Sequence, residues 1–165
     1  MCLNLKNARN FHNFYVIQWK KMRLSNLRDM KELSKKVIAQ IHSDSIILLK
    51  GELGVGKTTL ASYILQSIVN THENFTSPTF NIVHEYHTNN NVVFHLDLYR
   101  IKNINELYEI GFESMIQNNI MIIEWPEIAL PILKKFQSNR IIMIKLSFES
   151  SDVRVANIIT PCRID

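Results

Sequence analysis

A glycine-rich segment that ends in lysine and threonine carries the clearest chemical signal in this sequence. Residues 51–58 read GELGVGKT and match the P-loop pattern G-x-x-x-x-G-K-[ST]. Glycines in such a loop let successive backbone N–H groups point inward, and the positive end of the following helix adds to the attraction for phosphate. Lys57 would contact the β- and γ-phosphates, and the Thr58 hydroxyl would bind Mg²⁺. The segment therefore predicts a site for a nucleoside triphosphate with magnesium.

Two carboxylates at strand ends are candidates for binding the metal and activating water. Residues 120–124 (IMIIE) are an apolar run that ends in Glu124, and residues 92–97 (VVFHLD) end in Asp97. P-loop proteins place such an acid beside magnesium at the carboxyl edge of the sheet. Either acid could bind the metal or a metal-bound water, and the other could orient the attacking water. For each acid the alternative is a side chain that is merely solvated.

Other side chains near these acids are weaker candidates. His95 alternates with Asp97 and shares its strand face, but a single histidine on a half-buried strand is more often packed and hydrogen-bonded. The same interpretation applies to His84 and His87. Trp125 could stack on a base or a partner surface, or it could belong to the core.

The segment SPTF, residues 77–80, lies where a P-loop NTPase usually carries a switch near the γ-phosphate. Its two hydroxyl groups could sense that phosphate. A turn whose shape is set by Pro78 explains the same residues equally well.

The elements that must position these groups follow from the spacing of apolar residues. Ser25 or Asn26 can cap a helix whose apolar residues recur at intervals of three and four. Residues 45–50 (SIILLK) do not alternate, which is typical of a strand covered on both faces, and residues 58–69 form an amphipathic helix after the loop. The apolar positions of the first helix are Leu27, Met30, Leu33, Val37, Ile38 and Ile41.

A β-hairpin is predicted beside the site. Two β-rich runs, residues 81–87 and 92–97, are joined by the turn-forming residues 88–91. Because a hairpin adds an antiparallel strand to a sheet whose centre is parallel, a mixed sheet is expected. The expected fold class is therefore α/β, a three-layer P-loop NTPase fold with a mixed, mainly parallel central sheet.

The rest of the chain predicts one helix and three strands. Residues 105–116 suggest a helix that Gly111 can split, and residues 120–123 form a short buried strand. Two late strands, over residues 140–148 and 153–159, are expected at one edge of the sheet.

Composition sets the class of protein. The chain has 165 residues, of which 46% are hydrophobic and 21% charged, as in a single soluble globular domain. No apolar run approaches the roughly 18 residues that a membrane span needs, so no membrane association is expected. Cys2 and Cys162 stand far apart and outside any metal-binding spacing, which favours a reduced, cytoplasmic location.

The net charge of +4 is concentrated near the N-terminus. Residues 1–28 contain six basic residues and no acid, which leaves 13 basic and 15 acidic residues in the rest of the chain. The domain's own charge therefore does not support a tRNA-binding face, although the basic arm could touch an anionic partner. Residues 1–24 are expected to be a basic N-terminal extension that is disordered or reflects a mis-assigned start, in which case Met22 is the true start and residues 1–21 are dispensable. Residues 25–165 are expected to be a single P-loop ATPase domain.

Four motifs in order resemble the bacterial TsaE family, formerly called YjeE. The P-loop is shared by many families, whereas the other three motifs are specific to this one. The similarity runs over about residues 25–148, and the basic arm is the departure, because members generally begin just before the first helix. The motifs are GELGVGKTT (51–59), SPTF (77–80), HLDLYR (95–100) and IEWPE (123–127).

The resemblance implies a weak ATPase that acts with the TsaB and TsaD proteins. Together they place a threonylcarbamoyl group on the adenosine beside the anticodon of tRNA (t6A), and the ATPase meets tRNA only through the complex. Its turnover depends on the TsaB–TsaD dimer. Carried over residue by residue, the resemblance implies a magnesium site at Thr58 and Glu124, and a contact to the base near Leu27. It implies roles in hydrolysis for Lys57, Asp97 and Glu124. The phosphate-binding residues that it implies are Gly54, Val55, Gly56, Lys57, Thr58 and Thr59.

Two other functions stay open at this point. A small-molecule kinase would use the same P-loop, but such kinases carry several arginines in a lid, and Arg100, Arg140 and Arg154 are scattered. In a nucleotide-gated binding module, occupancy by ATP would matter and turnover would not. The sequence also leaves the choice between ATP and GTP open.

Overall fold

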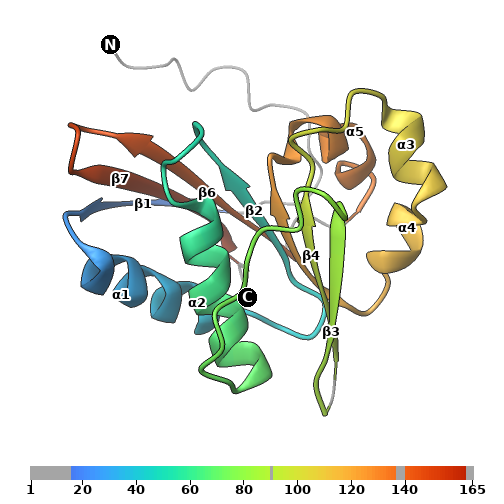
Figure 1. Cartoon of the computed structure of the whole chain (residues 1–165), viewed down its shortest axis with the longest axis horizontal. Coiled ribbons are helices and arrows are strands. Elements are labelled where there is room, and N and C mark those ends of the chain that lie inside the picture. The colour runs from blue at the N-terminus through green and yellow to red at the C-terminus, as the bar shows by residue number, and fades with distance from the viewer. Residues whose placement is uncertain (1–15, 90, 137–139, 163–165) are drawn as a thin grey trace.

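A single seven-stranded sheet with helices on both faces organises the chain (Figure 1). The computed structural model describes residues 16–89, 91–136 and 140–162. Within these residues no helix is both long and apolar enough to cross a bilayer. The elements in chain order are β1 (Val16–Leu24), α1 (Leu27–Ile38), β2 (Ile46–Lys50), α2 (Lys57–Val69), β3 (Val83–His87), β4 (Val92–Asp97), α3 (Ile104–Glu109), α4 (Phe112–Met115), β5 (Ile120–Glu124), η2 (Pro126–Ala129), α5 (Leu130–Leu133), β6 (Ile141–Phe148) and β7 (Arg154–Cys162).

The strand order is β1-β7-β6-β2-β5-β4-β3, and the middle of the sheet is parallel. Strands β6, β2, β5 and β4 run parallel to one another. The pairs β4–β3, β6–β7 and β7–β1 are antiparallel. The expected α/β fold with a mixed sheet is confirmed. The expectation that the two late strands lie at one edge is wrong, because β6 pairs with β2 and β7 lies between β6 and β1.

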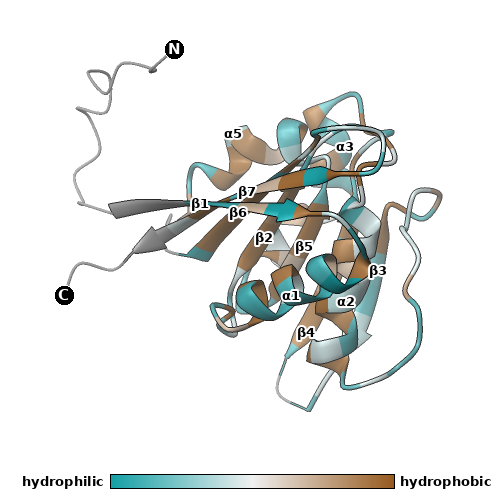
Figure 2. Ribbon diagram, turned by 90° about the vertical axis from the view of Figure 1, so that its left-hand side faces the viewer, coloured by the Kyte–Doolittle hydropathy of each residue, from teal (hydrophilic) through white to brown (hydrophobic). Residues whose placement is uncertain are grey.

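Strand β1 lies in the region where the sequence suggested an extension outside the domain. Residues 16–24 pair antiparallel with β7 along their whole length, so the boundary expected after residue 24 differs from the structure (Figure 2). The count of charged residues did not reveal this strand, because an edge strand tolerates exposed lysines, here Lys20 and Lys21. Such lysines also discourage the strand from pairing with other chains. Leu24 is buried and ties β1 to the core. Residues 1–15 lie outside the described residues.

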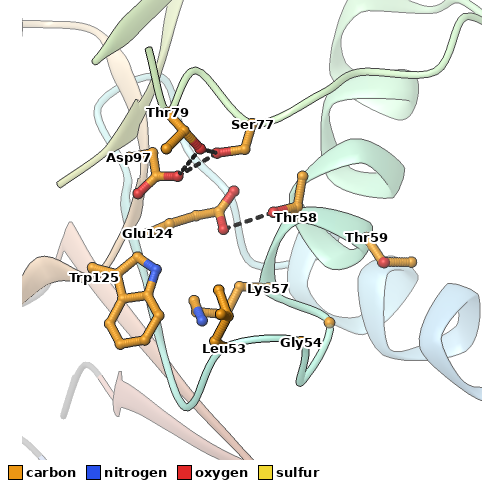
Figure 3. A pocket seen from close by; sticks show the side chains of 11 residues that line it. Leu53, Gly54, Lys57, Thr58, Thr59, Ser77, Thr79, Asp97, Glu124 and Trp125 are labelled. Atoms are coloured by element: carbon orange, nitrogen blue, oxygen red, sulfur yellow. Dashed lines mark hydrogen bonds between the residues drawn. The ribbon is translucent and has the colours of Figure 1, made fainter. Parts of the chain in front are cut away.

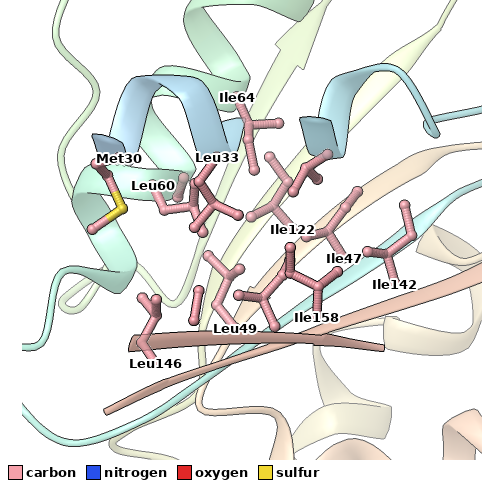
Figure 4. Close-up of a cluster of buried hydrophobic side chains, with 14 of the residues drawn as sticks. Met30, Leu33, Ile47, Leu49, Leu60, Ile64, Ile122, Ile142, Leu146 and Ile158 are labelled. Carbon is pink, nitrogen blue, oxygen red and sulfur yellow. The ribbon is translucent and has the colours of Figure 1, made fainter. Parts of the chain in front are cut away.

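Two apolar layers cover the two faces of the sheet. Because side chains alternate along a strand, Ile47 and Leu49 of β2 face α1 and α2, while Ile46 and Leu48 face α3, α4 and α5. Figure 4 shows the first layer, where Leu33 of α1 meets residues of α2 and the sheet. The uninterrupted apolar run of β2 is thereby confirmed as a strand covered on both sides.

Helix boundaries follow local chemistry. Asn26 caps α1 as expected, since its side chain accepts a hydrogen bond from the backbone N–H of Asp29 at 3.1 Å. The predicted helix over residues 105–116 is split at Gly111, whose φ of +74° is left-handed. The short helices η2 and α5 were not predicted, and each has a proline in its first turn, where proline is tolerated.

Candidate nucleotide-binding site

The P-loop turns sharply away from the end of β2. Gly51 has a φ of +143°, and a Cβ there would lie 2.3 Å from the Leu146 carbonyl oxygen of β6. The close approach of two backbones therefore requires glycine at this position. The helix α2 begins at Lys57 with Gly56 as its N-cap, and no side chain caps it. The first N–H groups of α2 are left available for an anion.

A cavity of about 230 Å³ lies beside this loop (Figure 3). It is formed by the P-loop, the first turn of α2, the segment before β3, and the ends of β4 and β5. The hydroxyl and carboxylate groups gather on one side of it, and Trp125 stands on another. The lining residues are Leu53, Gly54, Gly56, Lys57, Thr58, Thr59, Ser77, Thr79, Asp97, Glu124 and Trp125.

Glu124 connects the sheet to the P-loop helix. It is the last residue of β5 and only 1% exposed, and its Oε2 accepts a hydrogen bond from the Thr58 hydroxyl at 2.9 Å. A buried carboxylate is costly unless it is hydrogen-bonded or paired. The hydroxyl and the carboxylate predicted to bind magnesium are therefore in direct contact.

Asp97 lies directly beside Glu124, because β4 and β5 are parallel and the two acids are partners in register. Its Oδ2 accepts hydrogen bonds from the hydroxyls of Ser77 and of Thr79, the latter at 2.7 Å. Its Oδ1 accepts a third from the backbone N–H of Tyr99 at 3.0 Å. The SPTF segment is thus held to the strand-end acid.

Lys57 is folded back against its own loop. Its Nζ donates to the carbonyl oxygens of Gly51 and Glu52, each at 2.8 Å, and lies 3.7 Å from the centre of the Trp125 ring. Burial holds the pKa of the Lys57 ammonium below its ordinary value, and the nearby carboxylates, Glu124 foremost, offset part of this lowering. The lysine is a positive charge placed at the cavity wall.

Trp125 belongs to the cavity wall, where the sequence left either a core or a stacking role. Its backbone is left-handed, with φ of +55°, and its backbone N–H donates a hydrogen bond to the Leu49 carbonyl oxygen at 3.2 Å. Its ring centroid lies 4.9 Å from that of Tyr99. The reversal of the chain after β5 turns the indole toward Lys57.

His95 is packed and hydrogen-bonded, as the sequence favoured, and its partner belongs to the site. The ring is fully buried, and its Nε2 lies 3.0 Å from Glu124 Oε1. His84 and His87 lie elsewhere, on the edge strand β3. His84 is within hydrogen-bond distance of Asn81, and His87 is within hydrogen-bond distance of Glu85.

The structure brings together most of the predicted site residues. Two lie apart from the cavity lining: Val55 has its side chain fully buried in the core, so a phosphate could meet its backbone alone, and Leu27 is 65% exposed at the start of α1. Those brought to the cavity are Gly54, Gly56, Lys57, Thr58, Thr59, Asp97 and Glu124.

Four lining residues were absent from the predicted site set. For Ser77 and Thr79 the available signal was two hydroxyls flanking Pro78 just before a hairpin that ends in an acid. For Trp125 it was the place directly after a strand-end acid. Leu53 gave no signal, because its position in the P-loop pattern accepts any residue.

The polar groups at the cavity suit magnesium. Mg²⁺ prefers oxygen ligands and is usually held by one or two carboxylates together with substrate phosphates. Thr58 and Glu124 supply such oxygens, with Asp97 beside them. Among the described residues no group of three or more His, Cys, Asp or Glu side chains could hold a metal ion unaided.

Comparisons with known proteins identify the family that this chain resembles. A family model described as "Threonylcarbamoyl adenosine biosynthesis protein TsaE" matches residues 24–155. The chain is 36% identical to the tRNA threonylcarbamoyladenosine biosynthesis protein TsaE of Rickettsia felis over 137 residues, covering 83% of this chain and 78% of that protein. It is 34% identical to the protein of that name from Rickettsia bellii, covering 82% and 91% of the two chains.

A more distant relative and a solved structure extend the comparison. The Haemophilus influenzae protein named TsaE is 36% identical over 113 residues, covering 66% of this chain and 70% of its own. The crystal structure of YdiB from Bacillus subtilis superposes with a TM-score of 0.64 at 22% identity, covering 88% of this chain and 87% of YdiB. At that identity the superposition shows a shared fold.

Proposed function

The chain belongs to the TsaE family, and from this membership and the geometry of its cavity we propose that it binds and slowly hydrolyses ATP with Mg²⁺ in support of t6A modification of tRNA. The observation that carries the proposal is the contact between Thr58 and Glu124 at 2.9 Å, which joins a P-loop hydroxyl to a strand-end carboxylate. This pair of oxygen groups at the base of a phosphate-binding loop suits a magnesium nucleotide.

The P-loop residues bind the triphosphate. The N–H groups from Gly54 to Thr59 surround the phosphates, and the Lys57 ammonium leaves its loop carbonyls in part to contact the β- and γ-phosphates. Thr58 and Glu124 would hold the cation. When bound, Mg²⁺ neutralises charge that develops on the transferred phosphoryl group.

Asp97 orients the attacking water. It lies next to Glu124 in register and faces the same cavity, so its carboxylate can accept a proton from water near the γ-phosphate. Its Oδ2 accepts hydrogen bonds from the hydroxyls of Ser77 and Thr79. An acid occupied in this way supports slow turnover until the segment is rearranged.

We place the protein with TsaB and TsaD in the cytoplasm, with tRNA contacted through that complex. The names of the relatives, which refer to tRNA threonylcarbamoyladenosine biosynthesis, support this assignment. The TsaB–TsaD dimer would stimulate hydrolysis by acting on the segment that holds Asp97.

A kinase function is less well supported. Kinases that transfer a phosphoryl group to a small molecule close arginines over it. None of the arginines in the described ranges lines this cavity, and Arg140 pairs instead with Asp44 at a distance from it.

Hydrolysis assays test the proposal. The purified chain should release phosphate from ATP slowly, and faster when TsaB and TsaD are added. Lys57→Ala and Glu124→Gln should lose turnover while keeping the fold by circular dichroism, and Glu127→Gln, a neighbouring exposed acid, should behave as wild type. Unchanged hydrolysis in both site variants, or phosphate on a supplied nucleoside, would contradict the proposal. The same assays with GTP in place of ATP show which nucleotide the chain prefers.

A reconstituted t6A reaction separates turnover from occupancy. Glu124→Gln should retain ATP while losing hydrolysis, so it should fail to support repeated modification of tRNA. Full support of t6A formation by this variant would instead identify a nucleotide-gated binding module.

A further inference from the structure

His95 is a buried side chain that the proposed function does not use. It lies in β4 and is 0% exposed, with Nε2 3.0 Å from Glu124 Oε1. Its other ring nitrogen, Nδ1, has no hydrogen-bond partner in the described part of the chain. Since buried polar side chains are nearly always hydrogen-bonded, a ring whose sole contact of this kind is a carboxylate of the site requires an explanation.

Strand register explains how the ring reaches this carboxylate. Asp97 pairs with Glu124 across the parallel strands, and His95 precedes Asp97 by two residues, so all three side chains emerge on the face covered by α2. The ring contacts Oε1 from within the sheet, and the Thr58 hydroxyl contacts Oε2 from α2 at 2.9 Å. The two oxygens of Glu124 therefore have separate donors.

The contacts also determine which nitrogen carries the hydrogen. An ionised carboxylate accepts and does not donate, so Nε2 of His95 must be the donor. The contact with Glu124 therefore places a hydrogen on Nε2 and directs it to Oε1.

We propose that His95 is a positioning residue that binds Oε1 of Glu124 and leaves Oε2 directed toward Thr58 and the magnesium site. This inference rests on the proposed function, because it concerns the cation that Glu124 would hold. Groups that hydrogen-bond a metal-ligating side chain typically change metal affinity by about 10–100-fold. His95 would thus set the magnesium requirement without touching nucleotide or metal.

Three substitutions of His95 separate this role from packing. In His95→Gln the amide nitrogen can replace Nε2 as a donor, in His95→Asn it lies near the position of Nδ1, and His95→Leu has no donor. The matched control is His84→Gln, because His84 is the register partner of His95 on β3 but bonds to Asn81 and Tyr86.

Two measurements are made on each variant: ATP affinity in EDTA, and the Mg²⁺ concentration that gives half-maximal ATP binding. The affinity for ATP in EDTA should be the same in all four variants and in the wild-type chain. The Mg²⁺ requirement should rise about 10–100-fold in His95→Leu and His95→Asn, and by less than about 3-fold in His95→Gln and the control. A wild-type requirement in folded His95→Leu would overturn the inference.

A third measurement needs no variant. The ¹⁵N shifts of the His95 ring in the wild-type chain should show a hydrogen on Nε2. An Nε2 without a hydrogen would overturn the inference even if His95→Leu fails to fold.

The outcomes also distinguish this inference from the proposed function. If Glu124→Gln raises the Mg²⁺ requirement and His95→Leu does not, the positioning role alone is wrong. If the wild-type chain binds no ATP with Mg²⁺, the proposed function fails, and the inference fails with it.

Discussion

The site consists of two halves that are built from different kinds of structure. The P-loop half, comprising Lys57, Thr58 and Glu124, joins the start of α2 to the end of β5, both anchored in the core. The loop half, comprising Ser77, Thr79 and Asp97, joins the end of β4 to a segment without regular structure. The two acids are neighbours in register. Glu124 accepts a hydrogen bond from a residue of helix α2, whereas Asp97 accepts hydrogen bonds from hydroxyls of a loop.

Exposed and strained residues lie next to the loop half in the chain. Phe80 is 87% exposed, and the aromatic ring lies 5.2 Å from the Arg100 guanidinium. Ile82 has a φ of +65°, a left-handed backbone conformation that is unfavourable for a β-branched residue. The comparison teaches that the P-loop half is held by elements of the core, whereas the loop half depends on side-chain hydrogen bonds from a segment without regular structure.

The largest expected effects come from neutralising each acid. Glu124→Gln and Asp97→Asn should each lower the hydrolysis rate by about 100-fold or more, because one removes a metal ligand and the other the group that orients water. The Mg²⁺ requirement should rise in Glu124→Gln alone. Steady-state hydrolysis over a Mg²⁺ series measures both quantities. An equal rise in Asp97→Asn would show that both halves bind the cation.

A smaller effect is expected from the P-loop glycines. Gly51→Ala should lower the free energy of unfolding by about 2–4 kcal/mol, because the new methyl group meets the Leu146 carbonyl oxygen. Gly54→Ala is the matched control: its φ is also positive, at +75°, but nothing lies within 4 Å, so a loss of about 1 kcal/mol is expected. Urea denaturation measures both values, and equal losses would contradict a close-packed P-loop half.

The hydroxyls of the loop half should have moderate effects. Ser77→Ala and Thr79→Ala should each lower hydrolysis about 3–10-fold, because each removes a hydrogen bond to the Asp97 carboxylate. Since both hydroxyls bind one oxygen, the double variant should lose less than the product of the single effects. Ser67→Ala on α2, whose hydroxyl contacts the Tyr63 carbonyl oxygen, is the control. Multiplicative losses would show that the hydroxyls act independently.

The smallest effect on the isolated chain is expected at Phe80. Phe80→Ala removes an exposed ring and one cation–π contact, so the free energy of unfolding should change by less than about 1 kcal/mol and ATP affinity should not change. Stimulation of hydrolysis by TsaB–TsaD should fall if the loop half meets these partners. Full stimulation would place the partner contact elsewhere.

Much of the fold could be predicted because local patterns agree with the tertiary arrangement. The apolar run of β2, the cap at Asn26 and the break at Gly111 depend on residues close together in the chain. Strand β1 could not be predicted in this way. Its place depends on pairing with β7, more than 100 residues later, and its exposed lysines gave the composition of a tail.

The sequence by itself determined the chemistry of the site, because the P-loop pattern and the acids at two strand ends state which groups are present and at which sheet edge. Tertiary structure alone decided which groups meet. Parallel pairing of β4 with β5 sets Asp97 beside Glu124 and His95 against its second oxygen, while the segment at residues 77–79 reaches across to Asp97. These contacts join residues about 20 to 70 positions apart, and spacing within one segment cannot specify them.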